Sequence, residues 1–199
     1  MDIHNYKRLF ERQVELLKKS KDISKENKKI TLAFKDFLLS EGIGIAKIAR
    51  YLSDIRKFNE LLKKPFPKST ENDIRKVVAK IEQSNLAAET KKGFKIMLRK
   101  LYRFIGNVKE KGVYPEEVRW ISIALSKNHK KLPEELLTEE EIKKIVQNCT
   151  NLRDKTLVST LAESGCRISE IGGMQIKHVS FEDYGARLTV SGKTGMRKM

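Results

Sequence analysis

The sequence has little of what marks secreted, metal-binding or membrane proteins. It contains two cysteines, Cys149 and Cys166, with no CxxC pattern and no accompanying histidine pair. We therefore expect reduced thiols and no zinc site. No apolar run is long enough to span a bilayer, and the segment from Met1 to Ser20 has no signal-peptide core. These absences predict a protein of the cytosol or nucleoid that uses neither a metal nor another cofactor.

Acidic residues are scarce in one part of the chain. The formal net charge is +16. Residues 1–131 contain 32 Lys and Arg against 16 Asp and Glu, whereas residues 132–199 contain ten of each kind. This segregation favours a polyanion-binding domain joined to a neutral one. A lysine-rich solubilising surface unrelated to DNA would have a similar composition, so binding of nucleic acid has to be argued from further patterns.

Helical periodicity dominates the first two thirds of the chain, and β-type alternation is nearly absent there. Thr70, with Asp73 three residues later, forms a capping-box pattern that begins one of the helices. Residues 18–29 form a polar, basic connector. The periodicity predicts helices over residues 5–19, 30–39, 45–64, 70–81, 90–105 and 115–125.

Two of these helices carry basic residues at helical spacing. In residues 90–105, an apolar stripe from Phe94 to Ile105 faces the expected core, and a basic row occupies another face. Cations in such a row can neutralise DNA phosphates and release condensed counterions. The candidate DNA-binding cations are Lys47, Arg50 and Lys57 on the earlier helix, and Lys92, Lys95, Arg99 and Arg103 on the later one.

A polar, basic segment closed by Pro133 separates the charged part from the neutral part. We predict an N-terminal helix or arm over residues 1–29, a helical domain over 30–127, a linker over 128–133 and a further domain over 134–199. In this last domain a capping box at Thr138 and Glu141 begins a helix, a buried helix over 152–163 ends at Gly165, a short helix covers 168–172, and strands cover 177–181 and 187–190.

Several motifs in this order resemble the tyrosine recombinase, or phage-type integrase, family. Residues 162–171, Ala-Glu-Ser-Gly-Cys-Arg-Ile-Ser-Glu-Ile, resemble the family's first catalytic box. Residues 137–142 resemble the start of its catalytic domain, and residues 152–157 resemble the Arg-Asp opening of the helix before the catalytic box. Residues 190–197 resemble the Gly-Lys-Gly hairpin that carries its catalytic lysine. Residues 46–58 and 86–105 resemble helices of its core-binding domain, and this match adds Thr90 to the candidate DNA-binding residues. The resemblance covers about residues 30–199.

The resemblance implies a mainly α fold, in which a helical, SAM-like core-binding domain precedes an α+β catalytic domain with a small antiparallel sheet. It implies that Arg167 holds the scissile phosphate, that Glu170 orients its neighbours, and that Lys193 is the general acid. An Arg-x-x-Glu pair is by itself usually a local salt bridge, and Cys166 is best interpreted as a small buried apolar residue. The implied partner is double-stranded DNA, bound by four protomers on two duplexes.

The sequence departs from the family after Lys193. The family pattern continues with a His-x-x-Arg box and a distal nucleophilic tyrosine, whereas this sequence ends at Met199 and has only Tyr184 after the linker. We therefore expect a C-terminally truncated recombinase that is inactive alone and exposes apolar surface over residues 134–199. The alternative is a non-catalytic DNA-binding regulator on the same scaffold.

Overall fold

The computed structural model describes residues 4–124, 136–192 and 195–199. The chain divides into two compact units, one covering His4–Lys127 and the other covering Asn128–Met199 together with Met1–Ile3. Each unit is described by itself below. The predicted linker over residues 128–133 and the predicted catalytic Lys193 both lie outside the described residues.

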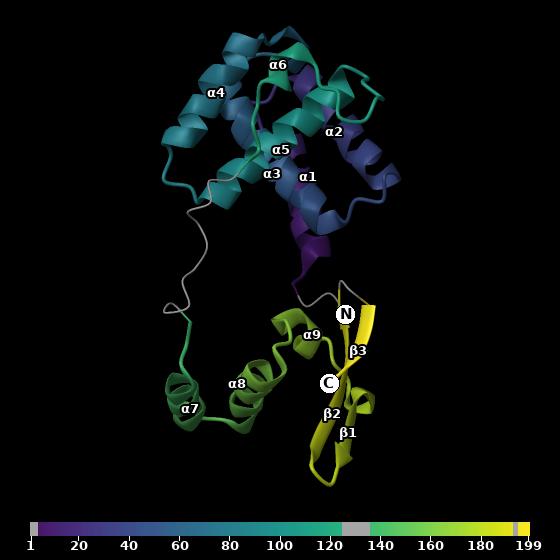
Figure 1. The fold of residues 1–199 in the computed structure, drawn as a ribbon. Helices are drawn as coiled ribbons and strands as arrows, with labels where there is room; N and C mark the ends of the chain where they lie inside the picture. Colours follow the sequence, from purple (N-terminus) through teal and green to yellow (C-terminus); the bar gives the residue numbers. More distant parts are fainter. Residues whose placement is uncertain (1–3, 125–135, 193–194) are drawn as a thin grey trace. The chain divides into compact units, whose positions relative to one another are not determined.

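The first unit, called the helical unit here, consists of α-helices and one 3₁₀ turn (Figure 1). The second, fourth and fifth helices extend beyond their predicted ranges because polar residues continue them, whereas the third and the last end earlier than predicted. The elements are α1 (Tyr6–Lys19), α2 (Lys25–Ser40), α3 (Ile45–Leu62), η1 (Phe66–Lys68), α4 (Glu71–Gln83), α5 (Ala88–Ile105) and α6 (Glu116–Arg119).

Side-chain caps set the beginnings of two of these helices. Thr70 accepts a hydrogen bond from the backbone N–H of Asp73, and Asp73 accepts one from Thr70 in return, so the predicted capping box is confirmed. The Ser24 hydroxyl accepts from the Asn27 N–H and begins α2 at Lys25. The end of the predicted 18–29 connector is therefore helical, because its Ser24 cap satisfies an N–H group that would otherwise lack a partner.

The core of the helical unit is centred on α3, which packs against α1, α2, α4 and α5. The Phe58 side chain of α3 is fully buried in this core, and the centroid of its ring lies 5.2 Å from that of Phe66 and 6.2 Å from that of Tyr102. Each fully buried large apolar side chain contributes about 1.5–3 kcal/mol. The largest fully buried side chains are Leu17, Phe34, Leu38, Ile48, Leu52, Ile55, Phe58, Phe66, Ile74, Ile81, Met97 and Leu98.

The N-terminal segment is part of this core. Leu17 of α1 is fully buried, and α1 packs against α3. The sequence left open whether residues 1–29 form an arm or a packing helix, and α1 packs as a helix of the unit.

The predicted helix over residues 115–125 is wrong in length, because α6 ends at Arg119. Val118 and Ile121 are both buried, and the Ile121 N–H donates to the Val118 carbonyl at 3.1 Å. This tight turn places two apolar side chains in the core and directs the chain out of the helix. Trp120 packs beneath the Arg75 guanidinium, which lies 4.1 Å from the ring centroid.

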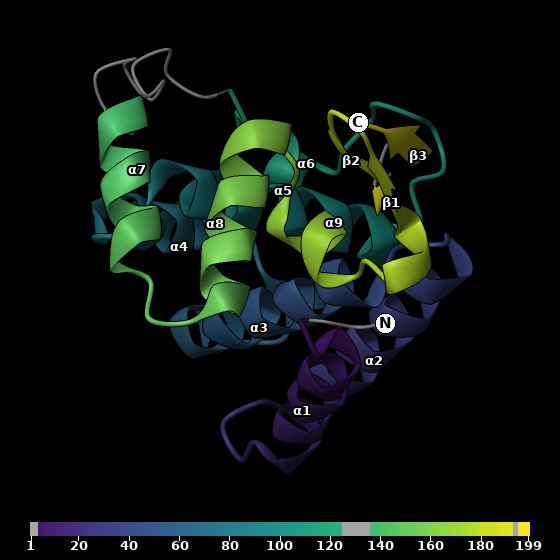
Figure 2. The ribbon, with the colours of Figure 1, turned by 90° about the horizontal axis from the view of Figure 1, so that it is seen from below.

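The second unit, called the C-terminal unit here, combines short helices with an antiparallel sheet of order β1-β2-β3 (Figure 2). In β2 and β3, Val190 pairs with Arg197 and Gly192 pairs with Gly195. The sequence predicted strands over 177–181 and 187–190 and a hairpin over 190–197, and β3 is the strand that follows this hairpin's turn. The elements are α7 (Glu139–Asn148), α8 (Leu152–Ser164), α9 (Ile168–Gly172), η4 (Ile176–His178), β1 (Val179–Glu182), β2 (Gly185–Gly192) and β3 (Gly195–Lys198).

Two local predictions for this unit are confirmed and one is wrong. Thr138 and Glu141 form a capping box at the start of α7, and Gly165 ends α8 in the left-handed conformation at φ 60°. The prediction that α8 is buried is wrong, since no residue of α8 is fully buried. Its packing partners are mainly α7 and α9, which leave part of the helix surface uncovered.

The described part of the C-terminal unit exposes large apolar side chains, as the sequence predicted. Ile176 and Phe181 are 93% and 86% exposed. The other exposed large apolar residues in this unit are Leu136, Leu137, Ile145, Leu152, Ile168, Tyr184, Met196 and Met199.

The buried Asn27 gives a test of this fold. Its Nδ2 donates to Asn59 Oδ1 at 2.8 Å and to the Lys64 carbonyl at 3.1 Å, and its Oδ1 accepts from the Phe66 N–H at 2.9 Å. Asn27→Ala leaves buried partners unsatisfied, so we expect the free energy of unfolding in urea to fall by about 1–3 kcal/mol. Asn72→Ala, at an exposed position of α4, is the control and should change it by less than about 0.5 kcal/mol. Equal effects would show that the Asn27 contacts contribute nothing.

Candidate nucleic-acid interface and candidate catalytic cluster

The two predicted basic rows meet where α3 packs against α5. A Cβ atom at Gly93 of α5 would lie 2.0 Å from Arg50 Nη2, so the Arg50 guanidinium of α3 lies directly on the α5 backbone. A side chain at position 93 would require the Arg50 guanidinium to move away from α5. The arrangement joins the α3 row to the beginning of the α5 row, next to Lys92.

The cations nearest this crossing are the least engaged of the predicted set. Lys47 is exposed and its Nζ lies 5.8 Å from the centroid of the Tyr51 ring. Lys92 is half-buried and makes no hydrogen bond or ion pair within the described part of the chain. Thr90 is exposed at the first turn of α5, and Lys57 is half-buried on α3. These side chains are available to an external anion.

One carboxylate lies among these cations, and the sequence prediction gave it no role. The Asp54 side chain is 18% exposed, and its Oδ2 lies 3.8 Å from Arg50 Nε. The same Oδ2 is shielded from solvent and accepts no hydrogen bond within the described residues. Burial raises the pKa of Asp54 to about 6, against the attraction of Arg50 and Lys57, which lowers it.

Farther along α5, the predicted DNA-binding cations contact other residues of the helical unit. Lys95 forms an ion pair with Glu82 at 2.8 Å, and its side chain is 19% exposed. The Arg99 guanidinium carbon lies 3.7 Å from the Tyr114 ring centroid, a cation–π contact. Arg103 donates to the backbone carbonyl of Glu110 at 3.2 Å.

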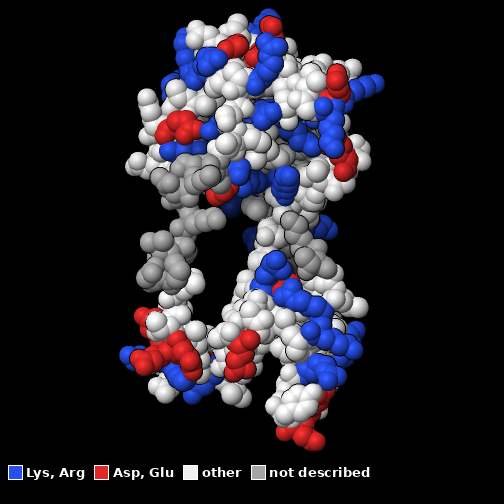
Figure 3. Space-filling view, viewed as in Figure 1, with Lys and Arg blue, Asp and Glu red and all other residues white. Residues whose placement is uncertain are grey.

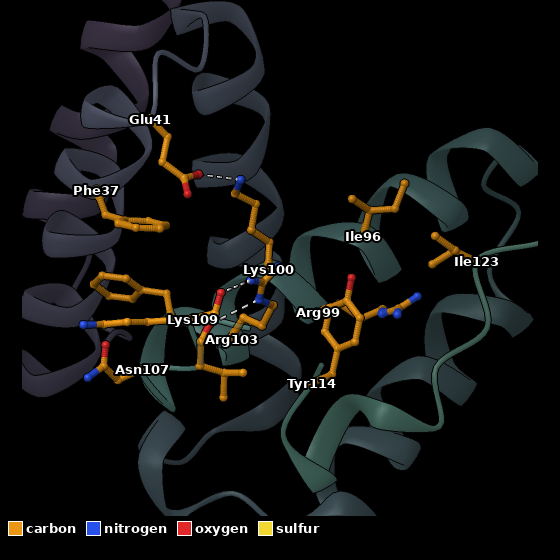
Figure 4. A pocket seen from close by; sticks show the side chains of 12 residues that line it. Phe37, Glu41, Ile96, Arg99, Lys100, Arg103, Asn107, Lys109, Tyr114 and Ile123 are labelled. Carbon is orange, nitrogen blue, oxygen red and sulfur yellow. Dashed lines mark hydrogen bonds and ion pairs between the residues drawn. The ribbon is translucent and has the colours of Figure 1, made fainter. Parts of the chain in front are cut away.

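These arginines line a pocket of about 630 Å³ between α2, α5 and the segment that follows α5 (Figure 4). Phe37 and Tyr114 contribute aromatic walls, and Lys100 crosses to Glu41 at 2.7 Å. Figure 4 shows Arg99 beside the Tyr114 ring. The row that the sequence treated as one surface is thus divided: Lys92 makes no ion pair or hydrogen bond within the described residues, whereas Arg99 and Arg103 hold residues 108–114.

The predicted catalytic box of the C-terminal unit forms a compact cluster around a buried carboxylate. Arg167 is the N-cap of α9, and its backbone N–H donates to Glu170 Oε2 at 2.9 Å. The Arg167 Nη1 donates to Glu170 Oε1 at 3.0 Å. The Arg167 side chain is 57% exposed, whereas that of Glu170 is 1% exposed. The backbone N–H of Arg167 is the main cause that lowers the pKa of Glu170.

Two further residues complete this cluster, and the sequence prediction assigned neither a role. Arg197 of β3 donates from Nη2 to Glu170 Oε2 at 2.9 Å. A Cβ at Gly192, the end of β2, would lie 2.0 Å from Glu170 Oε1. The strand that precedes Lys193 in the sequence therefore lies against the carboxylate that holds Arg167. The Gly192-Lys193 pattern was the available signal for the close approach, while Arg197 had no signal beyond its place in the hairpin motif.

Cys166 and Tyr184, the other two residues that the sequence analysis discussed, contact neighbours within the C-terminal unit. Cys166 is buried, as predicted, and its Sγ lies 3.0 Å from Met199 Sδ. Tyr184 is 83% exposed between β1 and β2, where its hydroxyl accepts from Arg187 at 3.3 Å. Among the described residues, no three His, Cys, Asp or Glu side chains gather as metal ligands. No helix in the same ranges combines the length and apolar character of a membrane span.

Comparison with known proteins supports one class. Residues 135–198 match the model of the phage integrase family. Tyrosine recombinase XerA of Pyrococcus horikoshii is 30% identical over 159 residues, which make up 78% of this chain and 50% of that protein. The chain thus spans about half the length of this curated relative.

Solved structures share the fold. A post-cleavage complex of the XerH site-specific recombinase bound to palindromic difH substrate has a TM-score of 0.58 and 17% identity, covering 97% of this chain and 62% of that chain. A pre-cleavage complex of XerH with difH substrate has a TM-score of 0.58 and 19% identity, covering 97% and 61%. The helical unit followed by helices and a small antiparallel sheet therefore shares the fold of XerH. The family model over residues 135–198 and the similarity to XerA both point to the tyrosine recombinases, the family that the motifs resemble.

The buried Asp54 predicts a pH dependence of stability. Its pKa of about 6 in the folded protein lies above 3.8, the ordinary value for an aspartate side chain. The folded state therefore binds the proton more tightly, and the contribution of this group to stability rises as pH falls through about 6 and is lost as pH rises. We expect the free energy of unfolding, measured in urea from pH 8 to pH 5, to increase more in the wild type than in Asp54→Asn. Equal increases would contradict the assignment.

Proposed function

We propose that this chain binds duplex DNA through the crossing of α3 and α5 and is part of an enzyme that cleaves and rejoins DNA at specific sites. The observation that carries the proposal is the contact of Arg50 with Gly93, which brings two rows of cations together on a strongly basic unit. Figure 3 shows Lys and Arg side chains spread over the helical unit. The substrate-bound XerH structures share this fold and support the proposal.

Phosphate neutralisation is the physical basis of the proposed binding. Lys47 and Lys92 have flexible side chains that can reach phosphate oxygens, and the Arg50 guanidinium is already placed by the α5 backbone. Each contact of this kind releases condensed counterions and makes the affinity depend on salt concentration. We propose that Arg99 and Arg103 support this surface by holding residues 108–114, and that they contact DNA less directly than Lys92.

The proposed chemistry assigns one role to each residue of the catalytic cluster. Arg167 would donate two hydrogen bonds to the non-bridging oxygens of the scissile phosphate, since its side chain remains more than half exposed while Glu170 holds one edge of it. Glu170 would orient Arg167. Lys193, which the family motif places after Gly192, would donate a proton to the leaving 5′ oxygen.

The nucleophile is the tyrosine that the family resemblance implies, and Tyr184 does not occupy its place in the motif order. We propose that this chain supplies DNA binding and part of the catalytic set, and that another chain supplies the nucleophilic tyrosine. Four protomers on two duplexes, acting at the nucleoid, is the assembly that the resemblance implies. The competing proposal, a non-catalytic DNA-binding regulator, differs in whether strand cleavage ever occurs.

The interface can be tested by removing two lysines that form no ion pair or hydrogen bond within the described part of the chain. We expect Lys47→Ala with Lys92→Ala to weaken duplex binding and to reduce the slope of log affinity against log salt by about 1.8, or about 0.9 for each phosphate contact. Lys76→Ala with Lys80→Ala, two exposed lysines of α4, removes the same charge and is the matched control. Fluorescence anisotropy over a salt series measures both. If the control pair reduces affinity and slope equally, the binding is not located at the α3–α5 crossing.

The catalytic assignment predicts that DNA binding and DNA cleavage separate. Arg167→Ala should leave duplex affinity within about twofold, because a single lost charge-assisted contact among many phosphate contacts changes the total little. The chain alone should form no SDS-resistant covalent adduct with a nicked duplex, and adducts should appear only when a chain carrying the distal tyrosine is supplied. An adduct lost on Tyr184→Phe would refute the proposed nucleophile. Absence of adducts under both conditions would favour the regulator.

A further inference from the structure

Arg197 lies on β3 and contacts the one carboxylate that also holds Arg167. Its Nη2 is 2.9 Å from Glu170 Oε2, and its side chain is 35% exposed. On the strand it pairs with Val190 of β2, which is buried, so its backbone is held by the sheet. Arg197 therefore connects the sheet to α9 through a charged hydrogen bond.

The groups around Glu170 restrict the rotation of its carboxylate. The carboxylate is almost fully shielded from solvent, with Arg167 on one side, Arg197 on another and the Gly192 backbone in contact with its Oε1. Oε2 accepts from the Arg167 backbone N–H and from Arg197 Nη2, and Oε1 accepts from Arg167 Nη1, so this buried carboxylate has little freedom to rotate. The Arg167 side chain is anchored on the oxygen that faces Gly192.

We propose that Arg197 is a positioning residue that fixes the Glu170 carboxylate against the sheet and thereby sets the direction in which Arg167 presents its free donors. This inference rests on the proposed function of Arg167 as the phosphate-binding residue. Two guanidinium groups share a single negative charge, so the cluster keeps an excess positive charge while Arg167 stays oriented. The geometry assigns contact with the phosphate to Arg167 and support of Glu170 to Arg197.

The positioning role of Arg197 can be distinguished from simple packing between β3 and α9. A residue that only packs between β3 and α9 could be replaced by any side chain that fills the space. A positioning residue requires a cation with a donor directed at Glu170 Oε2. Lysine keeps the charge and a donor, and glutamine keeps a donor on a shorter side chain but loses the charge. The two substitutions therefore separate the electrostatic role from the packing role.

The test compares Arg197→Gln and Arg197→Lys in the full 199-residue chain by NMR. In Arg197→Gln we expect the pKa of Glu170, read from its side-chain carboxyl ¹³C shift, to rise, because one neighbouring cation is lost. We also expect the Arg167 Nε–Hε signal to broaden or move, and titration with inorganic phosphate to move that signal at several-fold higher concentration. Arg197→Lys should restore most of both effects. Cross-strand contacts between residues 190 and 197 report whether β3 remains paired.

Arg187→Gln is the matched control, since Arg187 is a strand arginine paired with Glu182 at 2.9 Å. It should leave the Glu170 and Arg167 signals as in the wild type. The inference is overturned if Arg197→Gln leaves these signals and the phosphate titration unchanged, or if lysine does not restore them while β3 stays paired. Duplex binding by the helical unit is measured separately, so loss of the proposed DNA interface would appear there and not in the signals of this cluster.

Discussion

At two places in this protein a charged side chain lies directly on the backbone of a neighbouring element, and each place has a glycine. Gly93 accommodates the Arg50 guanidinium where α3 packs on α5, and Gly192 accommodates the Glu170 carboxylate where β2 meets α9. A Cβ atom at either position would lie 2.0 Å from the charged group. The candidate interface and the candidate catalytic cluster both depend on this close approach, because it fixes charged side chains that would otherwise rotate in solvent.

Some of the charged side chains are held by contacts within the protein, and others remain available to an external anion. In the helical unit, Arg99 and Arg103 are occupied by Tyr114 and by backbone carbonyls, whereas Lys47 and Lys92 stay available. In the C-terminal cluster, likewise, the supporting residue Glu170 is buried, whereas more than half of the Arg167 side chain is exposed. Support by one set of polar groups and presentation by another is the arrangement that pre-organised phosphate binding requires.

Much of the local structure was predictable because the signals act within a few residues. Capping boxes at Thr70 and Thr138 and the left-handed stop at Gly165 depend on neighbours three or four positions away. The order of motifs over about residues 30–199 likewise indicated the family and the general fold. The misses have tertiary causes. Helix α6 stops because Ile121 enters the core, and α8 stays partly exposed because few elements pack on it.

The sequence by itself determined the helices, the separation of charge, the recombinase motifs and the pairing of Arg167 with Glu170, since one turn of a helix brings i and i+3 together. Only the tertiary structure decided which predicted cations are free, because a basic row at helical spacing looks the same whether Glu82, Tyr114 or water lies opposite it. Tertiary structure also joined Arg197 to Glu170 and placed Asp54 beside Arg50 in a buried position. Contacts between distant segments depend on packing geometry, which spacing along the chain does not encode locally.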